Sequence, residues 1–382
     1  MTLRSFTATL FGLLVLVTFS GPAFAADSDD GDPDALGHSA DGNYWDWRPI
    51  GKLELPRLFV TRSAEGALGF DAFLTTKSAL NSGGYTVRNN TGERVAEARF
   101  AEIMEAGDHL YYPVAPRDGE IVVDLSITRQ LLFVFIVALL VYLIISNLAS
   151  RYAKGIGRDV APKGVWHNMM ETLIVFVRDE IARPAIGEAK YTKYLPYLLT
   201  VFIFVMLGNL LGLVPWIGVT ATSHIMVTGT LAVFTFVITQ FAGTKDYWAH
   251  VFNPPGVPGF VKPILIPIEI IGLFTKPLSL AFRLFGNMAS GHLVIVSLIG
   301  IAFILKAAFG AVVGSISLVL VSIPLTVFIY ILKLAVSLIQ AYIFTMLSAV
   351  FIGIAAEEHH HHDHDGHHDE LHAPTEQLAA AA

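Results

Sequence analysis

Polar residues recur at a helical spacing inside one of the most apolar stretches of this chain. Glu269, Lys276, Arg283 and Ser290 lie seven positions apart, and Asn287 follows Arg283 by four. Seven residues at about 100° each return to within about 20° of the starting direction, so these side chains share one helical face. A charged side chain inside a membrane is costly and usually marks a path for ions or protons. The stripe therefore predicts an ion-conducting site around Arg283.

A second, shorter set of polar residues lies in the last apolar stretch. Lys333, Ser337 and Gln340 follow one another at spacings of four and three, which places them on one helical face. Taken alone, Ser337 and Gln340 have an ordinary explanation as residues that pack or bond between membrane helices. His292 is also more often a packing residue than a proton carrier. Their role in ion transport is therefore a hypothesis that depends on Arg283.

The alternative for Arg283 is an arginine whose charged end reaches the membrane surface from a helix end. Apolar residues extend well beyond it on both sides, which argues against that position. Between Ile270 and Ala356 the sequence has no Asp or Glu, and Glu269 lies several turns away from Arg283. A buried charge needs an opposite charge beside it. The sequence therefore predicts a partner chain that carries a carboxylate within the membrane.

The composition points to a membrane protein. Hydrophobic residues make up 54% of the 382 residues and charged residues 15%, whereas soluble domains have about 25% charged residues. The absence of cysteine excludes disulfides and thiolate metal sites. The sequence has no G-x-x-x-x-G-K-[ST] phosphate loop and no basic cluster for nucleic acid. We therefore expect no nucleotide, cofactor or metal at the site, and no nucleic-acid partner.

The elements that must position these residues are long apolar helices. About 20 apolar residues cross a bilayer, and five stretches qualify: 130–149, 194–214, 225–242, about 264–305 and about 316–356. The last two exceed the length of a perpendicular crossing, so we expect them to be strongly tilted or partly outside the bilayer. The predicted fold is all-α in the membrane, with five membrane-crossing helices.

One further helix is predicted to lie along the membrane interface. Residues 164–183 place Val165 and Met169 on an apolar face, and His167 and Glu171 on a polar face. Such a two-faced helix favours the boundary between water and lipid. A loop helix without membrane contact is the alternative.

The start of the chain has the features of a signal peptide. Arg4 precedes a short apolar core, and an A-x-A cleavage site ends at Ala25; an uncleaved anchor is the alternative. Residues 26–126 combine short β-type runs with turn signals, and we expect a loosely structured region outside the cytoplasm. The basic loop 151–163 then lies in the cytoplasm by the positive-inside rule.

The same rule places the C-terminus in the cytoplasm, after a membrane domain that spans residues 127–358. Residues 359–382 form a tail rich in histidine and acidic residues. Its composition favours a solvated, disordered segment, and metal chelation by the histidines is the alternative.

Three strings carry a family likeness. Residues 276–293 read KPLSLAFRLFGNMASGHL, residues 337–347 read SLIQAYIFTML, and residues 208–216 read GNLLGLVPW. They closely resemble subunit a of F-type ATP synthases, and the resemblance covers most of residues 125–359 in the family's order. The N-terminal extension is similar to the long form of some bacterial members. The resemblance implies a non-catalytic, ion-translocating subunit of the bacterial inner membrane. It would work with a ring of c subunits, b-type peripheral stalk subunits and the lipid bilayer.

The resemblance also implies a role for each polar position. Arg283 matches the family's stator arginine, which faces the rotating c ring, and Gln340 matches the glutamine near it. Other positions match two offset half-channels that lead to the ring. Asn287 and Asn209 match polar channel residues, Glu269 matches a carboxylate on the cytoplasmic side, and His292 lies where the family has His or Glu on the opposite side. Ser290 and Lys333 lie on the same two polar stripes.

Lys333 departs from the family's pattern, which usually has Glu or His at that position. A buried lysine can give up its proton and act as a relay, whereas a lysine that stays charged would repel incoming cations. We favour the relay. His292 is the obvious titratable relay near the membrane middle, and His224, at the outer end of the preceding hairpin, is placed to deliver protons through water.

A protein of another class also fits part of the pattern. A secondary transporter can hold a polar site at the membrane midplane between broken helices. The two halves of this chain show no inverted repeat, and copurification with c and b subunits would separate the two hypotheses. Protons are favoured as the ion because His292 can titrate near neutral pH, and sodium stays open.

Overall fold

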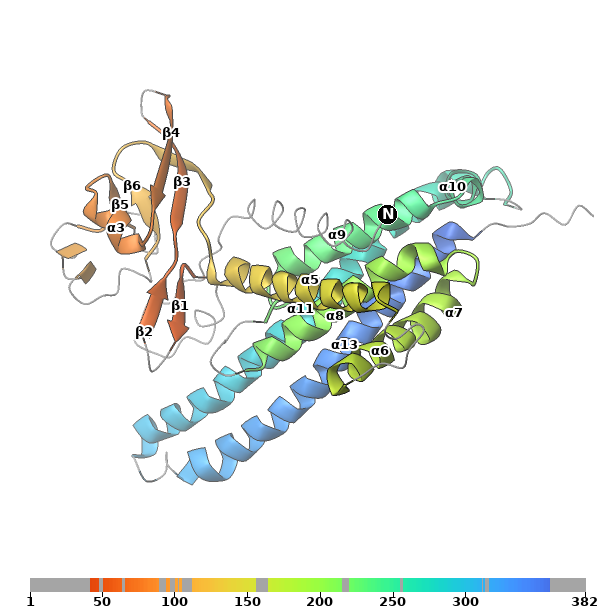
Figure 1. Ribbon diagram of the computed structural model, residues 1–382. Helices are drawn as coiled ribbons and strands as arrows, with labels where there is room; N and C mark the ends of the chain where they lie inside the picture. The colour runs from red at the N-terminus through yellow and green to blue at the C-terminus, as the bar shows by residue number, and fades with distance from the viewer. Residues whose placement is uncertain are drawn as a thin grey trace, which may run out of the picture.

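The computed structural model describes most of the chain from Gly42 to Glu357 (Figure 1). The described residues are 42–47, 51–63, 66–88, 94–96, 100–101, 103–104, 112–155, 164–214, 220–254, 257–310, 312 and 316–357. The side chains of a few residues inside these elements, His292 and Lys306 among them, are outside the description. The predicted signal peptide (1–25) and the histidine-rich tail (359–382) also lie outside it.

The region before the first membrane helix contains small antiparallel sheets. They are built from β1 (Tyr44–Trp47) with β2 (Gly51–Glu54), from β4 (Leu68–Phe73), β3 (Arg57–Arg62) and β7 (Glu120–Asp124) in that order, and from β5 (Tyr85–Val87) with β6 (Val114–Pro116). A short helix, α3 (Thr76–Asn81), precedes a turn in which Gly83 has a positive φ.

This region has a hydrophobic core of its own. Phe59 of β3 and Val87 of β5 are fully buried, and the ring of Tyr85 stacks on Phe59 at 5.1 Å between centroids. On the next position of β3, Val60 faces the other side of the sheet, as alternation along a strand requires. The β-type runs are thus confirmed. The expectation of a loosely structured region is wrong for these described residues, because their apolar faces pack together.

Among the described residues, five helices are long and apolar enough to cross a membrane, which agrees with the predicted number. They are α5 (Arg129–Ala153), α8 (Tyr191–Gly212), α9 (Ile225–Ala242), α11 (Lys262–Phe309) and α13 (Ile323–Ala356), the last preceded by a π-helical turn, η3 (Leu318–Ser322). The 48 residues of α11 extend over about 70 Å, more than twice the ~30 Å of the hydrocarbon core.

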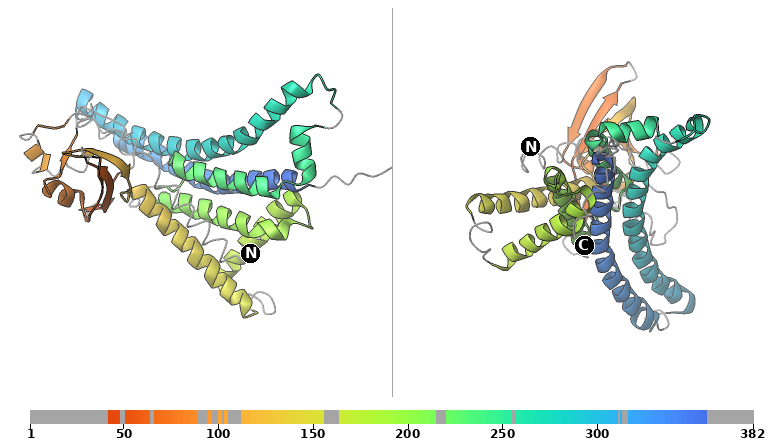
Figure 2. Two further views of the ribbon diagram at one scale, coloured as in Figure 1. Left: turned by 90° about the horizontal axis from the view of Figure 1, so that it is seen from above. Right: turned by 90° about the vertical axis from the view of Figure 1, so that its right-hand side faces the viewer.

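The long helices α11 and α13 lie side by side and extend beyond the rest of the bundle (Figures 1 and 2). Helix α8 is the most central element: it packs against α5 and α13, and the side chains from Leu198 to Val205 are all buried. Helix α9 packs against α11 and α13. The core therefore holds the polar stripes of α11 and α13 in a fixed register.

The predicted interfacial helix consists of α6 (Val165–Phe176), a π-helical segment, η2 (Val177–Ala182), and α7 (Arg183–Ile186). Its two faces are separate, as predicted, and the polar face is the one turned toward the protein. His167 is 1% exposed, whereas Val165 is 87% exposed. The reason is a contact with α5, where the ring of Tyr152 meets that of His167 and its hydroxyl donates to Glu171 at 2.6 Å. Val165 and Met169 are consequently turned outward, whereas Met170 is buried.

Two close contacts join the end of α13 to α7 and to the residue before α8. A side chain at Gly353 of α13 would collide with the carbonyl oxygen of Ala185 in α7. Lys190 donates from Nζ to the carbonyl of Ala356 at 2.7 Å. A further short helix, α10 (Lys245–Phe252), which the sequence analysis did not foresee, follows α9.

Candidate functional site

The unbroken course of α11 confirms that Glu269, Lys276, Arg283 and Ser290 lie on one helix. Leu280, Leu284 and Met288, spaced by four, are buried and set the rotation of the helix in the bundle. Arg283 is exposed and points away from this buried side. Among the described residues it has no hydrogen-bond or ion-pair partner. The guanidinium is therefore available to a group from outside this chain.

The second stripe lies in the interface between the two long helices. Lys333, Ser337 and Gln340 of α13 are all buried, which confirms that they share one face. The Ser337 hydroxyl donates to the backbone carbonyl of Lys333 at 2.7 Å, so it is satisfied within its own helix. Packing against α11 thus brings this polar face toward the stripe that contains Arg283.

One hydrogen bond joins the two stripes. The Asn287 amide donates from Nδ2 to Oε1 of Gln340 at 2.7 Å. Within the described part of the chain, Nε2 of Gln340 is buried and has no acceptor. A buried donor without a partner is costly, so this nitrogen is suited to a carboxylate or water that enters the interface. Ser290, one turn further on, is exposed and forms a long bond of 3.4 Å to the carbonyl of Asn287.

Lys333 lies over a glycine of the facing helix. Lys333 is 8% exposed, and a Cβ built at Gly291 would lie 3.0 Å from its Cε and 3.2 Å from its Cδ. Because glycine has no side chain, the aliphatic part of Lys333 can pack directly against the backbone at position 291. The sequence analysis missed Gly291, although a glycine next to His292 in a polar stripe could have signalled a close approach. The side chain of His292 lies outside the described residues.

Asn209 belongs to a separate polar cluster. It is fully buried in α8 and accepts a hydrogen bond from the Thr222 hydroxyl. Gln130 of α5 donates to the carbonyls of Thr220 and Ala221 at 3.0 Å, at the end where α5 leaves the β-sheet region. The described hydrogen bonds do not join Asn209 to α11 or α13.

Glu269 lies near the opposite end of the bundle, beside α10. It is half-buried, and it acts on the hydroxyl of Tyr247. Burial raises the pKa of Tyr247, the charge of Glu269 adds to this, and a hydrogen bond with Gln240 opposes it. The structure therefore separates the predicted site residues into a central group on α11 and α13 and one group toward each end.

A buried hydroxyl network escaped the sequence analysis. The hydroxyls of Tyr197 in α8 and Thr235 in α9 are 2.7 Å apart, and Thr235 lies 3.3 Å from the hydroxyl of Ser348 in α13. Threonine and serine are common packing residues in membrane helices. Their spacing along single helices therefore gave no signal of this contact between three helices.

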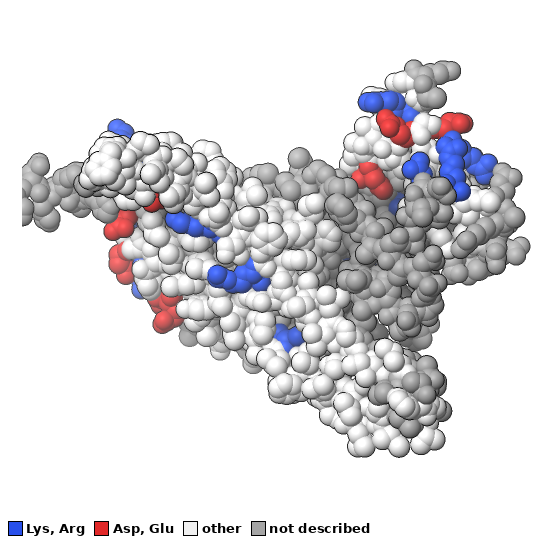
Figure 3. All heavy atoms as spheres, turned by 180° about the vertical axis from the view of Figure 1, so that it is seen from behind, with Lys and Arg blue, Asp and Glu red and all other residues white. Residues whose placement is uncertain are grey.

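The outward faces of the two long helices are apolar. Many of their large hydrophobic side chains are exposed, among them Ile268, Ile271, Leu278, Phe282, Phe328, Ile331, Leu334 and Leu338. Seen from behind, the helical bundle shows isolated basic groups on a broad uncharged surface with carboxylates along one edge, and the N-terminal sheet region carries groups of both signs (Figure 3). An apolar surface of this extent indicates contact with lipid or with another protein.

Comparison with known proteins agrees with this arrangement. The family described as the ATP synthase A chain matches residues 131–353. The chain is 44% identical over 286 residues to the ATP synthase subunit a of Chlorobium phaeobacteroides, a match that covers 72% of this chain and 79% of that protein. It is 41% identical to the ATP synthase subunit a of Myxococcus xanthus, covering 65% of this chain and 78% of that protein. This chain thus belongs to the family of ATP synthase subunit a, the non-catalytic, proton-translocating membrane subunit.

Proposed function

We propose that this subunit passes protons between two offset half-channels and that Arg283 is the stator arginine facing a ring of c subunits. The observation that carries the proposal is the position of Arg283: exposed on a long apolar helix, without an acidic partner among the described residues. A cation in that place needs a carboxylate from another chain. A ring that carries one carboxylate per subunit within the membrane would supply it.

The chemistry follows from the cost of charge in lipid. A carboxylate that travels through the bilayer must be neutral, because desolvating its charge costs several kcal/mol. Beside Arg283 it can ionise, because an opposite charge within about 4–6 Å favours the charged form of a carboxyl group. Arginine stays protonated when buried, whereas lysine can lose its proton. Arg283 therefore releases the proton of each arriving carboxyl group and prevents protons from crossing directly between the half-channels.

Gln340 and Asn287 are proposed to position the carboxylate once it has ionised. Their mutual hydrogen bond uses the carbonyl oxygen of Gln340 and leaves its Nε2 free to donate. A carboxylate that accepts this bond would be held between the amide and the guanidinium. Ser290, on the same face of α11, lines the route by which it leaves.

The two end groups are proposed to serve the two half-channels. Asn209, with Thr222, lies on the route from outside, and Lys333 and His292 lead from there toward the ring. Glu269 lies on the route to the cytoplasm. Lys333 acts as a relay, and its buried place over Gly291 supports this because burial disfavours a permanent charge.

The assembly follows from these roles. The subunit lies in the bacterial inner membrane with its N-terminus outside and its C-terminus in the cytoplasm. Its partners are the c ring and b-type stalk subunits. Copurification of those subunits with the tagged chain supports this function, whereas recovery of the chain alone or as a homodimer supports a transporter.

Arg283→Ala tests the stator assignment. We expect coupled ATP synthesis to be lost while the complex remains assembled, because the exposed guanidinium has no structural partner among the described residues. The measurement is proton-driven ATP synthesis in membrane vesicles, with subunit content checked by mass spectrometry. Arg151→Ala, which removes a cation at the end of α5, is the matched control. Near wild-type synthesis by Arg283→Ala would refute the assignment.

A further inference from the structure

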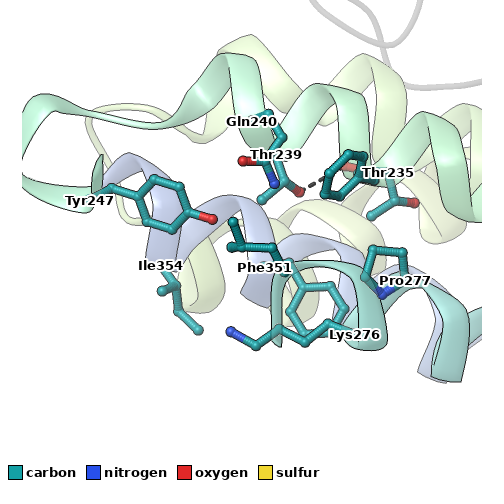
Figure 4. A pocket seen from close by; sticks show the side chains of 10 residues that line it. Thr235, Thr239, Gln240, Tyr247, Lys276, Pro277, Phe351 and Ile354 are labelled. Atoms are coloured by element: carbon teal, nitrogen blue, oxygen red, sulfur yellow. Dashed lines mark hydrogen bonds between the residues drawn. The ribbon is translucent and has the colours of Figure 1, made fainter. Parts of the chain in front are cut away.

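A small cavity lies between α9, α10, α11 and α13, two turns away from Arg283. Thr235, Thr239 and Gln240 line it from α9, Tyr247 from α10, Lys276 and Pro277 from α11, and Phe351 and Ile354 from α13 (Figure 4). The space open to the centre of a water molecule is about 20 Å³, which exceeds the roughly 10–15 Å³ that one buried water needs on the same measure.

The lining contains a polar atom that needs a partner. Oε1 of Gln240 is buried and accepts no hydrogen bond from the described residues. A buried acceptor without a donor is costly. The lining is mainly apolar, but Gln240, Thr239 and Tyr247 bring polar groups to it, and a cavity of this size with two or more polar partners can hold a water that satisfies them. Thr239 donates to the carbonyl of Thr235 at 2.8 Å, which leaves its hydroxyl oxygen free to accept a bond from the same water.

A tight turn holds α10 over the cavity. A side chain at Gly243 would meet the Tyr247 ring at 2.8 Å, so glycine allows α10 to fold back directly after α9. The backbone N–H of Thr244 donates to the carbonyl of Ala355 at 3.0 Å, and this bond joins α10 to the end of α13. Tyr247 is thereby held beside Gln240, at the cytoplasmic end of the proposed orientation.

One charged residue of the α11 stripe lines the cavity, and a second acts on a residue of its lining. Lys276 lines it and is exposed, seven residues or about 10 Å along the helix from Arg283. Glu269 lies seven residues further toward the helix start and acts on Tyr247. The positive charge of Lys276 favours the ionised form of an approaching carboxyl group, and so favours proton release at this end.

We propose that this cavity is a water-filled vestibule of the inner half-channel, in which Gln240 holds the water that connects the Lys276 side of α11 to Glu269. The inference deepens the proposed function and rests on it. A proton released by a ring carboxyl group passes to the vestibule water and then, by way of Glu269, to the cytoplasm. The path therefore runs behind α11, between α9 and α10, as well as along its outward face.

The lack of cysteine in this chain allows a direct test of water access. Single variants Gln240→Cys and Thr228→Cys are prepared in the assembled complex, and inverted vesicles receive a cationic, membrane-impermeant methanethiosulfonate. We expect modification of Gln240→Cys from the cytoplasmic side, with loss of ATP-driven proton pumping. Thr228, buried on the same helix and bonded to its own backbone, is the control that stays unmodified and active.

A pair of substitutions tests the role of the amide. Gln240→Leu removes the group that holds water and should slow proton translocation several-fold, whereas Gln240→Glu keeps an acceptor and should retain most of it. If Gln240→Cys is unreactive, or Gln240→Leu pumps normally, the vestibule assignment fails. The proposed function would still stand in that case, because Arg283→Ala tests it independently. If Gln240→Leu does not assemble, the labelling of Gln240→Cys alone decides whether the cavity is open to water from the cytoplasm.

Discussion

Lys333 and Gly291 form a size-matched pair across the interface of the long helices. The lysine stem occupies the space that a side chain at position 291 would fill. The sequence identified the lysine, because a charge in an apolar helix stands out. It could not identify the glycine, because the two residues are 42 positions apart and glycine is frequent in membrane helices. The same limit applies to the Tyr197–Thr235–Ser348 network, whose members lie on three helices.

Gly291→Val should therefore displace the Lys333 side chain. Overpacking in a tight interface costs about 1–3 kcal/mol, and the amine would leave its proposed relay position. We expect slower proton-driven ATP synthesis at unchanged complex content, measured in vesicles. Gly229→Val is the matched control, since a Cβ at Gly229 meets no atom within 4 Å. In the double variant with Lys333→Ala, the valine should add little further loss of ATP synthesis. A fully additive loss would contradict the proposal that Gly291 acts by making room for Lys333.

At the scale of elements, length and apolarity were sufficient to predict five spans. The bounds of α9 agree with the predicted 225–242, α11 extends a few residues beyond the predicted 264–305 at each end, and α13 begins later than the predicted 316, after η3. The orientation of α6 was not predictable from its own pattern, because a partner on α5 buries His167. Helix α10 was missed since its position depends on the turn at Gly243 and a bond to α13. Local sequence thus defined the elements, and contacts between distant segments decided their faces.

Gly353→Val should destabilise the end of the bundle where α7 packs against α13. The collision would involve the backbone carbonyl of Ala185, which cannot move aside as a flexible side chain can. We expect a clearly lower melting temperature of the detergent-solubilised complex, because α7 would separate from α13. Gly272→Val on α11, where a Cβ meets open space, is the control. Equal melting temperatures for the two variants would contradict the close approach of α7 and α13.

At the scale of the whole molecule, the β-sheet region and the membrane bundle are joined at several points. The backbone N–H of Arg129 donates to the carbonyl of Gly42 at 2.7 Å, and that of Ile127 donates to Pro56 at 3.0 Å. Strand β7 continues after four residues into α5. The sequence predicted a region outside the bundle but not this attachment, because its bonds connect residues more than 70 positions apart.

The C-terminal tail is predicted to be dispensable. Residues 361–382 follow the last apolar helix, and their charged, histidine-rich composition cannot form a packed core. Deletion of these residues should leave ATP-driven proton pumping at the wild-type rate, measured by fluorescence quenching in inverted vesicles. A deletion of the same length that begins inside α13 is the control that should abolish assembly. Loss of coupling in the tail deletion would assign the tail a function.

Helix α11 bends along its length (Figure 2), and it contains Pro267 and Pro277, residues that remove backbone bonds and bend helices. In the proposed function, this bent helix is the fixed surface against which the c ring turns. The curvature of α11 then limits the diameter of the c ring that fits against it. Replacing the c ring by one with a different number of subunits should therefore cause slippage, seen as ATP hydrolysis without matching proton transport, even when every polar residue is kept.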